Sequence, residues 1–242
     1  MLKKIGWLLS VIVLSGGNLY ASSITFDFSG STALDGTDGN IRTFTVGAVS
    51  VKTSAFSRDK STGVWSEAYL GSFLGGLGVT DNSEGAGTND HTVDNIGRDN
   101  YVLFEFSEKV VVGSAFLGVV VDDSDLTAWI GTKTDPFTNH QTLSDAFLAS
   151  LGFTESNLTA DTIPRTADLN AGNLLGNVLI IAAYTEDTTP EDQFEIQTLT
   201  INDTQGAEVP EPASLALLGV GLAGVAGLRR RRRAKFTSSK NR

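Results

Sequence analysis

Short runs in which apolar and polar residues alternate fill the central part of the chain, from about residue 22 to residue 208. Ile24, Phe26 and Phe28, for example, alternate with Thr25 and Asp27. A period of two places the apolar side chains on one face of a β-strand. Clusters of Gly, Asn, Asp and Thr separate the runs, as they do at turns. We therefore predict strands at residues 24–28, 41–46, 49–56, 64–70, 101–106, 110–121, 126–130, 178–184 and 194–201.

Two of these runs carry signals of irregular pairing. Gly113 and Gly118 lie inside the run 110–121, where glycine marks a bulge or the close approach of another backbone segment. In the last run, Phe194 and Ile196 fall on one face, whereas residues 199 and 201 fall on the other. A bulge near Thr198 would bring all four apolar residues to the same face.

One segment predicts a helix. From Ser144 to Leu151, apolar residues recur at helical spacing and Gly152 ends the pattern. We expect this helix to pack across one end of the sheets. Strands with one short helix predict a mostly β fold, a two-sheet sandwich or jelly roll formed by residues 22–208. No repeat of 20 to 50 residues is visible, which argues against solenoids and propellers.

The first 21 residues have the layout of a secretory signal peptide. Lys3 and Lys4 precede a short apolar run, Ile5 to Leu14, which is followed by two glycines and a small residue, Ala21. We predict cleavage after Ala21 by signal peptidase, after export through the Sec machinery. The chain has no cysteine, which excludes a lipoprotein anchor. A buried N-terminal helix is the alternative for this segment.

The other end of the chain combines three elements in a fixed order. Pro210, Glu211 and Pro212 come first, and proline at alternate positions cannot continue a helix or strand interior. An apolar, glycine-containing segment follows, which predicts a membrane helix at residues 213–228. Five arginines come next: Arg229, Arg230, Arg231, Arg232 and Arg233. Arginines directly after a membrane segment hold the tail on the cytoplasmic side.

This order resembles the PEP-CTERM sorting signal of Gram-negative bacteria, which the membrane protease exosortase recognises and removes. The resemblance covers residues 209–233. It implies that Pro210, Glu211 and Pro212 form the recognition motif, and that the protein passes through the inner membrane before it reaches the cell surface or the extracellular space. A basic tail, residues 234–242, extends beyond the point where such signals commonly end. A permanent membrane anchor is the alternative, whereas the position of the arginines argues against nucleic-acid binding.

Charge separates the two ends from the middle. The whole chain has a formal net charge of −10, but residues 22–208 contain 27 Asp and Glu against eight Lys and Arg, a net charge of −19. The absence of cysteine excludes thiol nucleophiles, iron–sulfur clusters and cysteine-ligated zinc. Two histidines are too few for a three-histidine metal site within one chain.

Clustered acids in two loops predict a calcium site. One loop contains His91, Asp94 and Asn95, and the second follows the run 110–121. The second loop contains Asp122, Asp123 and Asp125. His-x-x-Asp-Asn followed by two strands and an Asp-Ser-Asp turn resembles a pattern in exosortase-dependent surface proteins, and that resemblance implies no activity. Carboxylates suit Ca²⁺, so Asp94, Asp122, Asp123 and Asp125 are the candidate ligands. The alternative is that these residues only form turns.

No nucleophile motif, phosphate-binding loop or His-Glu-x-x-His motif is present. We therefore predict no catalytic residues. The expected function is that of a non-enzymatic surface or extracellular matrix protein of a biofilm, associated with exopolysaccharide. A glycoside hydrolase is one alternative, because a pair of carboxylates is a spatial criterion that sequence does not test. Trp65 and Trp129 are candidates for stacking on sugar rings or for core positions. The second alternative is a surface protein whose anchor is never cut.

Overall fold

The computed structural model describes residues 22–84, 91–159, 162–186 and 191–203. The only described helix is α1 (Asp145–Ala149). The strands are β1 (Ser22–Asp27), β2 (Arg42–Val46), β3 (Val49–Asp59), β4 (Trp65–Phe73), β5 (Gly76–Thr80), β6 (Val93–Asp94), β7 (Arg98–Asp122), β8 (Leu126–Gly131), β9 (Phe153–Asn157), β10 (Arg165–Asp168), β11 (Leu175–Ala183) and β12 (Asp192–Asp203). The mostly β class is therefore confirmed.

Every predicted strand corresponds to an observed one, with two differences. The predicted strands at 101–106 and 110–121 are parts of the single long strand β7. Strands β5, β6, β9 and β10 were not predicted. Two of the five residues of β5 are glycines, which are weak strand formers, and β6 has only two residues. These strands exist because longer neighbours offer hydrogen-bonding edges to them.

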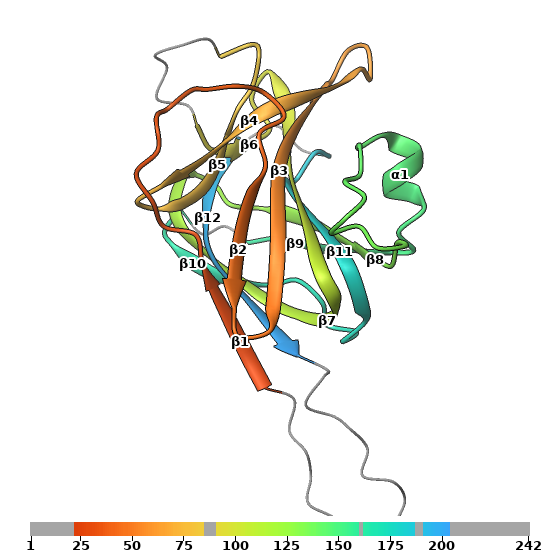
Figure 1. Cartoon of the computed structure of the whole chain (residues 1–242). Helices are drawn as coiled ribbons and strands as arrows, with labels where there is room; N and C mark the ends of the chain where they lie inside the picture. Colours follow the sequence, from red (N-terminus) through yellow and green to blue (C-terminus); the bar gives the residue numbers. More distant parts are fainter. Residues whose placement is uncertain (1–21, 85–90, 160–161, 187–190, 204–242) are drawn as a thin grey trace, which may run out of the picture. The chain divides into compact units, whose positions relative to one another are not determined.

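Strand β7 joins the two halves of the β structure. Its first part pairs with β3 and β11, and its second part pairs with β10 and β12. Figure 1 shows β7 running through the fold between these neighbours. All twelve strands belong to one hydrogen-bonded network, whose main path runs β1-β12-β5-β4-β3-β7-β11-β8-β9. The division into two packed sheets stays a prediction.

The predicted bulges are confirmed on both β7 and β12. The register shifts where Gly113 and Gly118 of β7 have no partner in β12, and again at Gln197 of β12. A side chain at Gly118 would meet the backbone oxygen of Gly75 at 2.5 Å, so this position needs glycine. The bulge at Gln197 brings the apolar residues on either side of it to one core.

The sheet region around β7 is buried on both faces. Val102 and Phe104 of β7 point into the main core, whereas Tyr101 and Leu103 point into a second apolar cluster on the opposite face. Strand β11 alternates in the same way. When both the odd and the even positions of a strand are apolar, both faces of the sheet must be packed against other parts of the protein.

The cover on the outer face comes from α1 and the residues beside it. Leu143 and Leu151 are buried in the second cluster, and Phe147 packs against it. The Ser144 side chain caps the helix by accepting a hydrogen bond from the Phe147 amide at 3.1 Å. The helix therefore lies on the face of the sheet (Figure 1), and the expectation that it packs across one end of the sheets is wrong. Burial of Leu143, Phe147 and Leu151 in the second apolar cluster holds the helix on this face.

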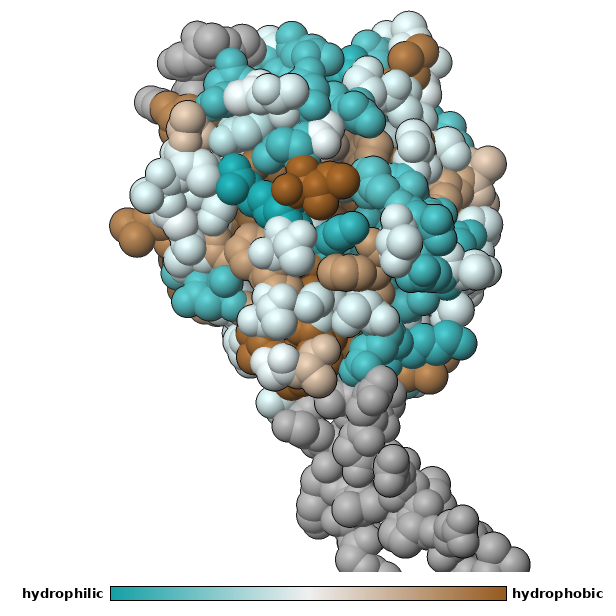
Figure 2. Space-filling view, in the orientation of Figure 1, coloured by the Kyte–Doolittle hydropathy of each residue, from teal (hydrophilic) through white to brown (hydrophobic). Residues whose placement is uncertain are grey.

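The first and last described residues lie side by side. In the antiparallel pair of β1 and β12, Ser22 is opposite Asp203. The described domain therefore begins and ends at neighbouring positions, at the same end of the β1–β12 pair. Polar residues dominate the face shown in Figure 2, where the hydrophobic groups are separate from one another. No helix among the described residues is long and apolar enough to cross a membrane.

Candidate metal centre

Three buried carboxylates meet where β7, β8 and β12 come together. Asp123 and Asp125 lie in the turn between β7 and β8, and Asp192 is the first residue of β12. One carboxylate oxygen from each lies within 4.8 Å of the others. The three residues are 7%, 7% and 1% exposed. They are the only group of three or more such ligands at this spacing among the described residues.

The backbone fixes this turn against β12. The Asp123 amide donates to the Val121 carbonyl at 2.8 Å, and Asp122 has a φ of +62°. Aspartate tolerates this left-handed conformation better than most residues. The Gln193 amide then donates to the Asp123 carbonyl at 3.0 Å. The turn therefore folds back and carries Asp123 alongside the start of β12.

Amide donors orient the Asp123 and Asp192 carboxylates. The Ser124 amide donates to Asp123 Oδ1 at 2.7 Å, and the Asp125 amide donates to Asp192 Oδ1 at 2.8 Å. The Asn95 side chain donates from Nδ2 to Asp192 Oδ2 at 2.9 Å, and its Oδ1 accepts from the Asp192 amide at 3.1 Å. Asn95 thus connects the loop after β6 to the carboxylate group.

A guanidinium group lies beside the same turn. Arg165 donates from Nε to Ser124 Oγ at 2.7 Å and from Nη2 to the Ser124 carbonyl at 2.6 Å. Its Nη1 donates to Asn157 Oδ1 at 2.6 Å. Arg165 therefore holds the turn that carries Asp123 and Asp125 and places positive charge near them.

The four predicted ligands do not all lie together. Asp123 and Asp125 belong to the group. Asp122 is exposed, and its Oδ2 accepts from Gln193 Nε2 at 3.4 Å. Asp94 is fully buried, and its carboxylate accepts from Thr92 Oγ1 at 2.9 Å and from the Ile96 amide at 3.0 Å. Asn95, the neighbour of Asp94, is the residue of this loop whose side chain bonds to Asp192.

Asp192 was not among the predicted ligands. The sequence contains one usable signal, an acidic residue two positions before the apolar alternation of the last strand begins at Phe194. That signal becomes informative only when β12 is known to pair with β7. Three carboxylates at this spacing repel one another, and a divalent cation relieves such repulsion. Carboxylate oxygens are the ligands that Ca²⁺ takes in proteins.

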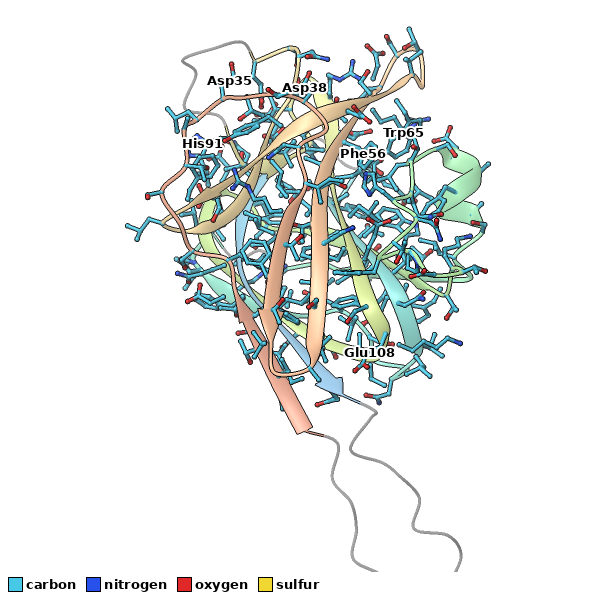
Figure 3. All side chains as sticks on the ribbon, in the orientation of Figure 1. Asp35, Asp38, Phe56, Trp65, His91 and Glu108 are labelled. Atoms are coloured by element: carbon cyan, nitrogen blue, oxygen red, sulfur yellow. The ribbon has the colours of Figure 1, made fainter. Side chains whose placement is uncertain are left out.

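The two histidines, Trp65 and Trp129 do not belong to this group. His91 Nε2 is 3.4 Å from Glu195 Oε1, and His140 Nδ1 is 2.6 Å from Glu105 Oε2. Trp65, labelled with His91 in Figure 3, is half-buried and packs against Tyr101 with ring centroids 4.6 Å apart. Trp129 packs on the same tyrosine at 6.0 Å. Trp65 and Trp129 are partly buried and pack against the second apolar cluster.

Glu195 predicts a measurable dependence of stability on pH. Burial raises the pKa of its carboxyl to about 7, from an ordinary value of 4.5. The folded chain therefore binds this proton more tightly than the unfolded chain, and the resulting stabilisation is complete below about pH 4.5 and lost as the pH rises through 7. We expect the free energy of unfolding of the wild type to fall relative to Glu195→Gln by on the order of 3 kcal/mol between pH 4.5 and 8.

Urea unfolding of the purified mature protein at a series of pH values measures this difference. Glu186→Gln removes an exposed carboxylate and serves as the control, which should keep the pH profile of the wild type. If the Glu195→Gln and wild-type profiles run parallel, Glu195 ionises at its ordinary pKa in the folded protein.

The predicted processing segments lie outside the described residues. These are the signal peptide at residues 1–21, the membrane helix at 213–228, and the sorting residues Pro210, Glu211, Pro212 and Arg229 to Arg233. A family model described as the PEP-CTERM protein-sorting motif matches residues 208–232. No curated protein and no solved structure matches the chain.

The motif match confirms the resemblance, and its bounds agree with residues 209–233 to within one residue at each end. The chain therefore carries a PEP-CTERM sorting motif. This motif marks it as an exported surface protein that is directed to exosortase through a membrane-anchored sorting step.

Proposed function

We propose that the mature protein is a non-enzymatic component of the bacterial surface or extracellular matrix, associated with exopolysaccharide and released from the inner membrane by exosortase. Export through the Sec machinery and removal of residues 1–21 by signal peptidase precede that step. The observation that carries the proposal is the sorting motif at residues 208–232, which follows the last strand of the domain.

The positions of the two cuts support this order of processing. A cut after Ala21 leaves β1 whole, because β1 begins at Ser22. The sorting motif begins five residues after Asp203, where β12 ends. Neither cut removes a strand, so the β domain is retained in full. We propose that this domain is a sandwich in which the two parts of β7 belong to different layers.

Calcium is the cofactor that we propose for the domain. Asp123, Asp125 and Asp192 supply three carboxylate oxygens within 4.8 Å of one another, and further oxygen ligands would complete the coordination shell that Ca²⁺ prefers. Asn95 and Arg165 hold the loops that carry these ligands. The ion would stabilise the junction of β7, β8 and β12, which is a structural role.

Fractionation of a host that has exosortase tests the proposed function. We expect the protein in the extracellular matrix fraction, bound to exopolysaccharide whose chain length does not change on prolonged incubation with the purified protein. In a host that lacks exosortase, the protein should stay with the inner membrane. Shortening of the polysaccharide chains would contradict the non-enzymatic role and support a hydrolase.

A further inference from the structure

Aromatic and charged side chains form a row across the outer face of the sheet, the face that α1 covers. Arg58 of β3 is directly opposite Trp65 of β4 and, on its other side, Asp99 of β7. Residues directly opposite one another in antiparallel strands project from the same face, with Cβ atoms roughly 5 Å apart. Tyr101 lies two positions after Asp99, so it projects from this face too and belongs to the second apolar cluster. The row therefore adjoins that cluster.

Two contacts fix the orientation of the Trp65 indole. Its ring packs on the Tyr101 ring, with centroids 4.6 Å apart and an angle of 47° between the planes. Its Nε1 donates to Asp145 Oδ1 at 3.0 Å. The side chain is nevertheless only partly buried, and Figure 3 shows Trp65 on the side of the fold where α1 lies. A partly exposed indole held in one orientation offers a preformed apolar surface to a ligand.

Asp145 and Arg58 place hydrogen-bonding groups next to this indole. Arg58 donates to Asp145 from Nε to Oδ1 at 2.9 Å and from Nη2 to Oδ2 at 3.3 Å. The hydrogen bonds from Arg58 and then from Trp65 lower the pKa of the Asp145 carboxyl, so this group is an anion at neutral pH. The Asp145 side chain is 64% exposed and that of Arg58 is 27% exposed. Each therefore has hydrogen-bonding capacity left for a ligand.

Asp99 adds a buried acceptor to the row. It is 4% exposed, and burial raises the pKa of its carboxyl. The Lys60 ammonium lies 3.6 Å from Asp99 Oδ1, which is too far for a hydrogen bond of ordinary length, and this oxygen makes none. The Lys60 side chain is itself 32% exposed. A ligand hydroxyl group that enters beside Lys60 would supply the missing hydrogen bond.

This combination of groups suits a sugar ring. The C–H face of a sugar ring is apolar and stacks on an indole, whereas its hydroxyl groups donate to carboxylates and accept from a guanidinium group. A wholly apolar ligand would leave the charged groups of the row without partners. The net charge of −19 on residues 22–208 disfavours a polyanion. An uncharged saccharide is therefore the ligand class that fits best.

We propose that Trp65, Arg58, Asp145 and Asp99 form a binding site for an uncharged segment of exopolysaccharide. Trp65 is the stacking surface, Asp145 and Arg58 bind hydroxyl groups beside it, and Asp99 accepts from a further hydroxyl group. The site rests on the proposed function, since it names the part of the domain that associates with exopolysaccharide. It binds the chain without breaking a glycosidic bond.

Equilibrium binding of the purified mature protein to the uncharged exopolysaccharide fraction of the native host tests this site. We expect Trp65→Ala and Asp145→Ala each to weaken binding about tenfold. Asp145 is exposed, so its variant is the safer one for folding. The matched control is Trp129→Ala. Trp129 is also partly buried and also packs on Tyr101, but no charged residue among those described bonds to its indole, so this variant should keep the wild-type affinity.

Failure of the site and failure of the proposed function give different results. If wild-type protein binds exopolysaccharide and Asp145→Ala or a folded Trp65→Ala binds equally well, the site is overturned while the association stands. An equal loss for Trp129→Ala would also overturn it, as would binding of the acidic fraction alone that weakens with added salt. If the wild type binds neither fraction, the association itself is wrong and the site loses its ligand. Far-ultraviolet circular dichroism verifies that each variant retains the β fold.

Discussion

Replacing Glu211 with alanine should leave uncut protein in the inner membrane of a host that has exosortase. Glu211 lies between two prolines, and prolines at alternate positions are unfavourable in the interior of a helix or strand. It is the charged residue of the Pro-Glu-Pro element and lies within the matched sorting motif. Intact mass spectrometry should find a wild-type form that lacks Arg229 to Arg242, and a Glu211→Ala form that retains them.

Two further variants separate recognition from retention. Glu186→Ala removes an exposed acid of the folded domain and should be processed like the wild type. Neutral replacements at Arg229 to Arg233 should release unprocessed protein or mislocalise it, because arginines directly after a membrane segment hold a tail on the cytoplasmic side. A mature wild-type protein that still carries Arg229 to Arg242 would reject processing and favour the permanent anchor.

Local patterning predicted most strands because each apolar alternation is a property of a few consecutive residues. The bulges at Gly113, Gly118 and Gln197 were also visible locally, as glycines inside a strand and as a break in the alternation. The order of the strands was not predictable in this way. Which edge β5 or β10 joins depends on contacts between residues far apart in the sequence, and no short segment encodes that choice.

In the candidate metal centre, too, local features were predictable and long-range contacts were not. The Asp-Ser-Asp turn identified Asp123 and Asp125, but Asp192 lies 67 residues after Asp125 and reaches it only because β12 pairs with β7. Asp94 and Asn95 illustrate a second reason. Neighbouring residues of an extended segment point to opposite sides, so when the Asn95 amide reaches Asp192, the Asp94 carboxylate faces Thr92 and Asn100.

Calcium should raise the melting temperature of the mature protein, and Asp192→Asn should greatly reduce that response. A ligand that binds only the folded state at a hundredfold excess over its dissociation constant adds about 2.7 kcal/mol to the free energy of unfolding. For a domain of this size, that corresponds to roughly 5 to 10 °C. Without Ca²⁺, Asp192→Asn should differ less from the wild type than it does in Ca²⁺, because it removes one of three mutually repelling charges while it also removes an acceptor for Asn95 or for the Asp125 amide.

That second expectation distinguishes a cation site from an ordinary turn. If Asp192 only accepts hydrogen bonds from Asn95 and from the Asp125 amide, its replacement by asparagine loses an acceptor and destabilises the protein equally with Ca²⁺ and with chelator. Asp122→Asn is the matched control, since Asp122 is adjacent, exposed and in a left-handed conformation that asparagine tolerates. It should melt like the wild type under both conditions. If the wild type has the same melting temperature in millimolar Ca²⁺ and in chelator, these carboxylates only form turns and do not bind Ca²⁺.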